Sequence, residues 1–213
     1  MLWLAAPACV LAFAAALALR PWRTLGPGGP PWPWLAWCVV MPFLWTADRW
    51  SAMPAAQPLS GACLLLLMAG WPLATLALVP VTLLAAWLGQ LGAAEAFERA
   101  LWLGVAPATA ALLLGAAVRR FAPKHLFVYI FGRGFLVPVL VNLAAGSARA
   151  LASPLPQGLA LADLMVARWL TGWGDAVLTG MITAIFVAFR PQWLATYADR
   201  LYLPTDHPGG NAS

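Results

Sequence analysis

The sequence predicts an all-α integral membrane protein, a polytopic helical bundle with about seven transmembrane helices. Two observations carry this prediction. The 213-residue chain is 63% hydrophobic and only 9% charged, whereas soluble domains carry about 25% charged residues. The charges also leave long gaps, with none from Thr24 to Ala47 and none from Trp50 to Ala94. Each gap can hold a membrane span of about 20 residues, so the expected solvent is lipid.

The first two spans are expected near the N-terminus. Leu2–Leu19 is apolar and is followed by Arg20 and Arg23. Because positive charge follows this segment instead of preceding it, a retained span is favoured over a signal peptide. Trp34–Trp45 is a shorter apolar segment with tryptophan at both ends, as in the two interfacial belts of a membrane protein. Loops are expected at residues 25–33 and 46–58.

A long apolar block, Leu59–Leu91, is interrupted by Gly70-Trp71-Pro72. As one helix it would be about 50 Å long, which exceeds a hydrocarbon core of roughly 30 Å unless the helix is strongly tilted. Proline cannot continue the hydrogen-bond ladder of a preceding helix. The block is therefore predicted to form two spans that meet at this tripeptide.

Three further spans are expected in the second half, at Ala100–Val118, Leu126–Ala150 and Asp175–Phe189. Residues 1–204 are expected to form a single transmembrane domain. The polar residues 205–213 are expected to form a mobile tail, since chain ends without apolar side chains are seldom held in place.

The basic residues favour seven spans over six. With the long block split, one side holds seven basic residues, Arg20, Arg23, Arg119, Arg120, Lys124, Arg190 and Arg200. The other side holds four, Arg49, Arg99, Arg149 and Arg168. The richer side should be cytoplasmic, which puts the N-terminus outside and the C-terminus inside. If Leu59–Leu91 were a single span, the basic residues would no longer be concentrated on one side of the membrane.

Residue types argue against several functions. His125 and His207 are the only histidines, and the sequence has no His-Glu-x-x-His motif, paired-cysteine motif or phosphate loop. We therefore predict no enzyme activity, no cofactor and no metal ligands, and no basic run is dense enough for nucleic acid. Cys38 and Met41 lie one helical turn apart and could hold a soft metal, although apolar packing is favoured.

Polar residues in or beside the later spans are the candidate functional residues. A charge within hydrocarbon costs about 2.5–3.5 kcal/mol on insertion scales, so it usually faces a partner or a wet cavity. The candidates are His125, Arg133, Asn142 and Asp175, with Asp163 and Arg168 beside them. They could line a substrate path, or Asp175 or Asp163 could pair with Arg133 or Arg168 to lock helices together; the second interpretation is favoured.

Position along the helices refines these candidates. Asn142, nine residues beyond Arg133, should face the other side of a regular helix. Arg133 lies close enough to the Leu126 end of its span to snorkel toward the interface. For His125 a helix-start or interface role is favoured over metal binding. Separately, Ala8, Ala12 and Ala16 form a small-residue stripe that could dock a partner helix.

Several segments together resemble a known transporter family. They are Pro123–Gly132 (PKHLFVYIFG), Gly174–Gly180 (GDAVLTG), Arg190–Leu194 (RPQWL), and Leu59-Ser60-Gly61 followed by Gly70-Trp71-Pro72. In this order they are similar to the membrane permeases of cobalt/nickel energy-coupling factor (ECF) ABC transporters, over most of residues 55–195.

The resemblance implies a seven-span subunit of the bacterial inner membrane that captures Co²⁺ or Ni²⁺ from outside. It also implies a second ECF membrane subunit and ATPase subunits as partners. The family's metal site uses the N-terminal amine, a histidine at position two and a histidine before the Leu-Thr-Gly motif. Here those positions hold Leu2 and Pro58, and no histidine precedes His125.

The sequence therefore predicts a divergent permease-like subunit for uptake of a transition-metal ion or a related substrate. The alternative is a non-transporting membrane scaffold or assembly factor that keeps the fold without the metal site.

Overall fold

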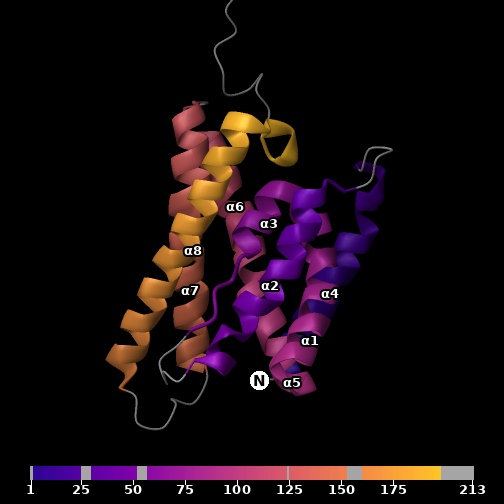
Figure 1. Ribbon diagram of the computed structural model, residues 1–213, viewed down its shortest axis with the longest axis vertical. Coiled ribbons are helices and arrows are strands. Elements are labelled where there is room, and N and C mark those ends of the chain that lie inside the picture. Colours follow the sequence, from indigo (N-terminus) through magenta and orange to yellow (C-terminus); the bar gives the residue numbers. More distant parts are fainter. Residues whose placement is uncertain (1, 25–29, 52–56, 124, 153–159, 198–213) are drawn as a thin grey trace, which may run out of the picture.

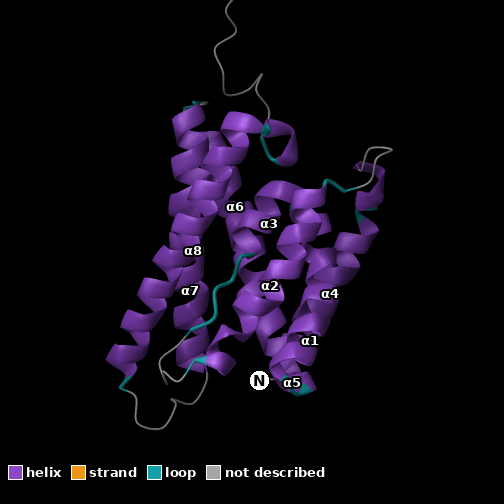
Figure 2. Cartoon of the chain, viewed as in Figure 1, coloured by secondary structure: helices purple, strands orange, loops and turns teal. Residues whose placement is uncertain are grey.

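The computed structural model describes residues 2–24, 30–51, 57–123, 125–152 and 160–197. Within these ranges every regular element is a helix (Figure 2), which confirms the all-α prediction. The α-helices are α1 (Leu2–Ala18), α2 (Trp32–Trp50), α3 (Ala62–Ala69), α4 (Trp71–Gly89), α5 (Ala93–Arg99), α6 (Ala106–Phe121), α7 (Val137–Ala152) and α8 (Leu161–Phe189). The predicted tail, residues 205–213, lies outside the described residues.

Two wide π-helical stretches and two short 3₁₀ turns complete the described chain. The π stretches are η2 (Ala100–Val105), which joins α5 to α6, and η3 (Val128–Leu136), which leads into α7. The 3₁₀ turns are η1 (Pro21–Thr24) and η4 (Pro191–Trp193). Segments of the π type are rare and are often found at functional positions.

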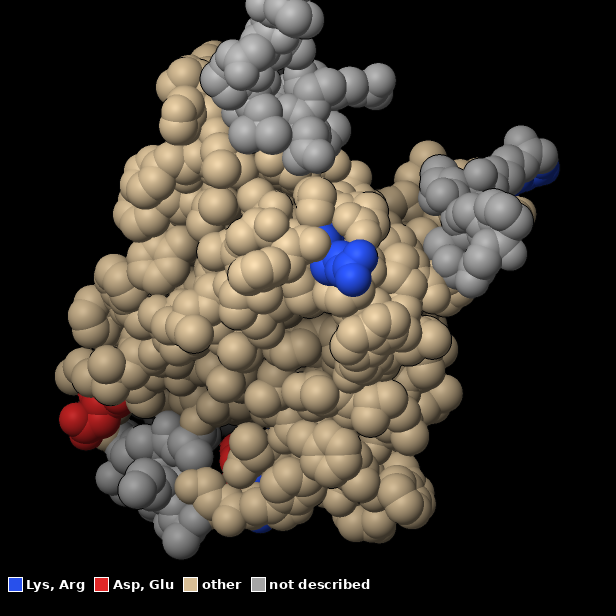
Figure 3. Space-filling view, turned by 45° about the horizontal axis from the view of Figure 1, so that its top comes forward, with Lys and Arg blue, Asp and Glu red and all other residues tan. Residues whose placement is uncertain are grey.

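Four of the described helices are long and apolar enough to cross a membrane. They are Trp71–Gly89, Ala93–Phe121, Val128–Ala152 and Leu161–Phe189. Figure 3 shows a face of the molecule on which charged side chains are few. The described chain is accordingly a helical protein with four helices that could span a membrane and with surfaces compatible with lipid contact. The number of seven spans and the inside–outside orientation stay predictions.

The helices form two outer groups with three helices between them. α7 and α8 lie side by side along one edge, and α1 and α4 lie together on the other (Figure 1). α2, α3 and α6 fill the space between them. The last turn of α6 carries Arg119 and Arg120, and Arg190 follows α8. These ends lie together at the upper end of Figure 1, which we call the basic end.

The predicted break at Gly70-Trp71-Pro72 is confirmed. α3 ends at Ala69, and Gly70 adopts a positive φ of 75° that glycine tolerates. Pro72 lies in the first turn of α4, where its missing N–H has no intrahelical partner to lose. The long apolar block therefore divides into a helix of 8 residues and one of 19. Only the second is long enough to cross a membrane, so the prediction that the first part also forms a span is wrong for α3.

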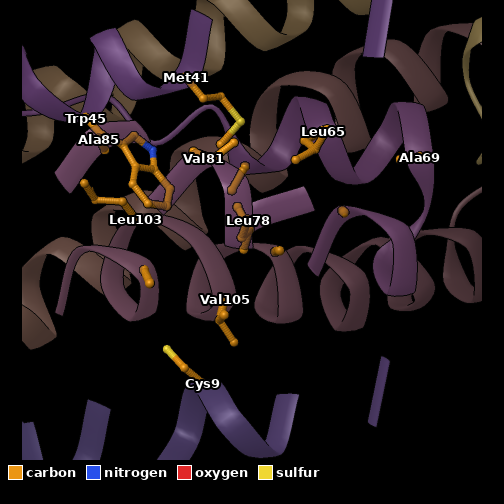
Figure 4. Close-up of a cluster of buried hydrophobic side chains, with 14 residues drawn as sticks. Cys9, Met41, Trp45, Leu65, Ala69, Leu78, Val81, Ala85, Leu103 and Val105 are labelled. Atoms are coloured by element: carbon orange, nitrogen blue, oxygen red, sulfur yellow. The ribbon is translucent and has the colours of Figure 1, made fainter. Parts of the chain in front are cut away.

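The main core lies between α2, α4 and the η2–α6 helix. Figure 4 shows Met41 and Trp45 facing Leu78, Val81 and Leu103 in this cluster. Gly104 permits the close approach, because a Cβ there would lie 2.8 Å from Leu78 and 3.1 Å from the Trp45 ring. Trp45 is 0% exposed, so its predicted place in an interfacial belt is wrong.

Two predicted helix boundaries are also wrong, for one physical reason. The second helix continues to Trp50, past Asp48 and Arg49, and the last helix begins at Leu161 and not at Asp175. Charged residues mark the ends of spans only where they meet water. Here Asp48 and Asp175 have hydrogen-bonding partners within the bundle, and the helices continue through them.

The alanine stripe of α1 is used inside this chain. Ala16 is fully buried, and Ala12 packs against the main core beside Cys9. α1 lies against α4 and α5, where small side chains allow close helix contact. Ala16 is thus covered by the chain's own helices and Ala8 and Ala12 are half-buried, while docking of a partner helix on this face stays a prediction.

Candidate functional site

A non-helical segment, residues 57–61, enters the helical bundle between α2 and α3. Its sequence disfavours a helix, since Pro58 has no backbone N–H and disfavours a helical conformation in the residue before it. Gly61 has a φ of 66°, which a residue with a side chain rarely adopts. A Cβ at Gly61 would also lie 3.1 Å from the Trp37 ring, so both conformation and space require glycine there.

Side chains from other elements satisfy the backbone of this segment. The indole nitrogen of Trp45 donates to the Ser60 carbonyl at 2.8 Å, and that of Trp37 donates to the Gly61 carbonyl at 2.9 Å. The Ser60 hydroxyl donates to the Leu103 carbonyl at 2.6 Å. Irregular backbone at membrane depth is tolerated only when its polar groups find such partners.

Asp175 completes the network from the middle of α8. Its side chain is 1% exposed. One carboxylate oxygen accepts the Gly61 N–H at 2.8 Å, and the other accepts the Asn142 amide at 2.5 Å. The carboxylate thus joins the non-helical segment, α7 and α8. Gly172, one turn earlier, lies against the α7 backbone at Val139 and Leu143, which brings the two helices close together.

A small cavity lies beside this carboxylate. It has a volume of about 20 Å³, which is enough for one water molecule. Its polar lining comes from the non-helical segment, α7 and α8, and comprises Ser60, Asn142, Arg149, Arg168, Thr171 and Asp175.

The charge balance of the cavity is positive. One carboxylate, Asp175, faces two guanidinium groups, Arg149 and Arg168. The Nε of Arg168 is buried and has no hydrogen-bond partner within the described residues. The Arg168 stem lies over Gly146, where a Cβ would come within 3.0 Å of it. Such a lining favours water, or a ligand with hydrogen-bond acceptors, over a free cation.

The described residues contain no group of three or more His, Cys, Asp or Glu side chains that could hold a metal ion. Nickel and cobalt prefer imidazole and similar nitrogen donors, and the cavity lining has none. Cys38 and Met41, the alternative soft-metal pair, both pack into the main core, as the favoured interpretation expected.

The four candidate residues divide into two places. Asn142 and Asp175 meet at the cavity. Arg133 lies elsewhere: it donates to the Thr196 carbonyl at 3.3 Å and its guanidinium lies 5.3 Å from the centre of the Tyr129 ring. Asn142 and Arg133 contact different elements, but Arg133 lies in the π-helical stretch η3, so the regular helix on which their predicted separation was based is not present there.

The favoured pairing of an acid with an arginine is not formed at these positions. Asp175 bonds to Gly61 and Asn142, and Asp163 is exposed at the start of α8. Among the described ion pairs, none involves Arg133 or Arg168. His125 is exposed, and its Nδ1 accepts the Phe127 N–H at 3.2 Å at the start of a helix. The helix-start interpretation of His125 is therefore confirmed.

Sequence reasoning missed the donors that hold the non-helical segment. Trp37 and Trp45 donate through their indole N–H groups. Arg149, which lines the cavity from α7, was also missed as a site residue. The spacing of Pro58 and Gly61 within an apolar block was the available signal of an interruption. The pairing of Gly61 with Asp175, 114 positions away, leaves no local trace in the sequence.

No protein-family model, curated protein or solved structure matches this chain.

Proposed function

We propose that this chain is a divergent permease-like subunit of an ECF-type ABC transporter in the bacterial inner membrane. On this proposal it works with a second membrane subunit and with ATPase subunits. The observation that carries the proposal is the interrupted segment at Ser60-Gly61, held inside a membrane bundle by a buried carboxylate. Transporter sites are typically built where discontinuous helices meet polar side chains near the middle of the membrane.

The position of Asp175 supports a site at that depth. It lies near the middle of the 29-residue α8, far from either end of the helix. A buried ionisable residue at such a depth is expensive and is usually functional. Its two hydrogen bonds connect α7 and α8 to the non-helical segment, so a movement of either helix would change the cavity.

The residues that line the cavity limit the kind of substrate that it could bind. A bare transition-metal ion finds one carboxylate and two arginines here, and no imidazole. A metal carried within an organic ligand, or a related small molecule with acceptor groups, fits the arginines better. Because the cavity of about 20 Å³ holds only water-sized groups, such a cargo requires the α7–α8 pair to move away from residues 57–61.

Two measurements test the proposal together. The tagged full chain is purified from native membranes in a mild detergent, and co-purifying ATPase subunits are identified by mass spectrometry. Uptake of radiolabelled Co²⁺ and Ni²⁺, alone and with chelating ligands, is compared between cells that express the wild type and Asp175→Asn. We expect ATPase subunits to co-purify with the wild type and with Asp175→Asn. We expect uptake to be reduced only in cells that express Asp175→Asn. Asp163→Asn, at an exposed position on the same helix, is the matched control.

A non-transporting scaffold is the second candidate, favoured by the water-sized cavity and the missing metal ligands. It predicts no ATPase partner and no change in uptake of any tested cargo when Asp175 is replaced in a folded protein. That combined result would reject the transporter proposal.

A further inference from the structure

A second small hollow, mostly apolar but lined by two arginines, lies at the basic end and shares no lining residue with the Asp175 cavity. It is formed where the last turn of α6 meets the π-helical stretch η3, and Arg119, Pro123, Tyr129 and Arg133 line it. Its volume is about 10 Å³, so a single oxygen-sized group fits inside. Any larger ligand must lie at the mouth and direct one atom inward.

Arg133 is the unusual member of this hollow. It is 9% exposed, so about nine-tenths of the residue is buried. Among the residues that the structure describes, its Nε has no hydrogen-bond partner and no carboxylate pairs with its guanidinium. The side chain lies against Gly115 of α6, where a Cβ would come within 3.1 Å of the Nε. A buried charge without a counter-charge is strongly unfavourable.

The contacts that Arg133 makes within the described residues do not include a counter-charge. One is a hydrogen bond of 3.3 Å to the Thr196 carbonyl, which is long for a charged donor. The other is the face of the Tyr129 ring, 5.3 Å from the guanidinium carbon. A ring face and one carbonyl contribute partial negative charge only. An anionic group is the ligand that such a site lacks.

The surroundings indicate where the anion comes from. Arg119 lines the same hollow and is exposed, and Arg120 lies beside it with its guanidinium carbon 5.7 Å from the Phe121 ring centre. Phe121 and Phe127 are largely exposed next to the hollow, which suits contact with acyl chains. Basic pockets between helices on the side predicted to be cytoplasmic are typical sites for anionic lipid headgroups.

We propose that Arg133 and Arg119 form a binding site for the phosphate group of an anionic phospholipid. One phosphate oxygen points into the hollow toward the Arg133 guanidinium, and the rest of the headgroup lies outside beside Arg119. The acyl chains lie along the exposed phenylalanines. This site is separate from the Asp175 cavity and does not depend on the transport proposal.

Native mass spectrometry of the full chain in a neutral detergent tests the site. The protein is titrated with phosphatidylglycerol or with zwitterionic phosphatidylcholine, and the fraction that retains lipid is measured. We expect selective retention of phosphatidylglycerol, weakened about tenfold in Arg133→Gln because a charge-assisted contact is lost. Arg119→Gln should weaken it as well, and this exposed variant should fold even if Arg133→Gln does not. Arg120→Gln, a neighbour that does not line the hollow, is the matched control.

Competition with inorganic phosphate distinguishes a lipid ligand from a free phosphate compound. If the ligand is a lipid, millimolar phosphate does not displace phosphatidylglycerol. Displacement would instead assign the same arginine site to a free phosphate compound. Equal retention by wild type, Arg133→Gln and Arg119→Gln, or an equal loss in Arg120→Gln, would overturn the proposal, because binding would then be absent or spread over the whole basic surface.

An internal counter-charge is tested in the same series. Asp199 is the acidic residue nearest to Thr196 in the sequence. If Asp199→Asn lowers the melting temperature as much as Arg133→Gln, and phosphatidylglycerol stabilises neither the wild type nor the variants, Arg133 is neutralised within the chain and the lipid site is rejected.

Discussion

Two buried arginines at opposite ends of the bundle differ in how their charge is compensated. Arg99 is 2% exposed and donates to both carboxylate oxygens of Asp48, at 2.8 and 2.7 Å, and to Glu95 at 2.8 Å. It also donates to the Trp45 carbonyl. Arg133 is 9% exposed and finds one carbonyl and one ring. The first arginine has counter-charges within the chain, whereas the second has no carboxylate partner among the described residues.

The difference follows from what each arginine joins. Arg99, at the end of α5, brings α5 against the last turn of α2, where Asp48 and Arg49 lie. Arg49 in turn pairs with Glu95, so four charges form one ionic network between the two helices. Arg133 belongs to the π-helical stretch η3 and lies beside Gly115. The space left by that glycine, and not an opposite charge, accommodates the Arg133 side chain. Burial alone therefore does not identify a structural ion pair.

Arg99→Gln is expected to have the largest effect on stability. It removes a buried charge and leaves Asp48 and Glu95 without their main partner, and breaking such a pair costs about 3 kcal/mol or more. The measurement is the free energy of unfolding in detergent micelles. Arg49→Gln, whose pair with Glu95 is more exposed, is the control and should cost less than about 1 kcal/mol. Equal effects for the two variants would show that burial of Arg99 does not matter.

Asp175→Asn should have an intermediate effect, about 2 kcal/mol, because hydrogen bonds to a charged acceptor are lost. The oxygen of the new amide can still accept from Gly61, but its NH2 group faces the Asn142 NH2 group, so the Asn142 amide must turn over to offer its oxygen, and both hydrogen bonds are then between neutral groups. Asp163→Asn, on the exposed first turn of α8, should leave the unfolding free energy nearly unchanged. A stability equal to that of the wild type would mean that Asp175 does not hold the non-helical segment.

Arg133→Gln should change the free energy of unfolding by only about 1 kcal/mol in pure neutral detergent. Loss of the contacts to Thr196 and Tyr129 is offset by removal of an uncompensated buried charge. Added phosphatidylglycerol should stabilise the wild type and not the variant. A loss as large as that of Arg99→Gln in the absence of lipid would show that the two arginines are equivalent, contrary to the comparison.

Thr179→Val should have the smallest effect, within about 0.5 kcal/mol of zero or stabilising. The Thr179 hydroxyl is buried and has no partner among the described residues, so its removal relieves a desolvation cost. Thr75 is the matched control, since it is equally buried and donates to the Trp71 carbonyl at 2.8 Å. Thr75→Val should cost about 1 kcal/mol. The opposite order would imply a hidden partner for Thr179.

Local chemistry accounts for what the sequence predicted correctly. The all-α class follows from composition, and the break at Gly70-Trp71-Pro72 follows from proline and glycine geometry. The helix-start role of His125 also depends only on its neighbours. Each of these features is decided within one or two helical turns, so the order of residues is sufficient to reveal it.

The parts that the sequence could not predict depend on distant partners. Asp175 and Asp48 were expected near helix ends because charges usually mark them, but Gly61 and Arg99 compensate them inside helices. Trp45 was expected at the interface, and the Ser60 carbonyl holds it in the core. The relative position of α7 and α8 along their axes brings Asn142 to Asp175. No local sequence pattern predicts that position.

The hydrogen bond from Gly61 to Asp175 also has a consequence for biosynthesis. The acceptor is made 114 residues after the donor, when helices α3 to α7 have already been synthesised. Until α8 arrives, the Gly61 amide lacks its partner, and the eight-residue α3 is too short to cross the bilayer by itself. The nascent chain must therefore keep this segment near water, or within the insertion machinery, until the last helix is in place. A truncated chain that ends before α8 should accordingly be a target for membrane quality control.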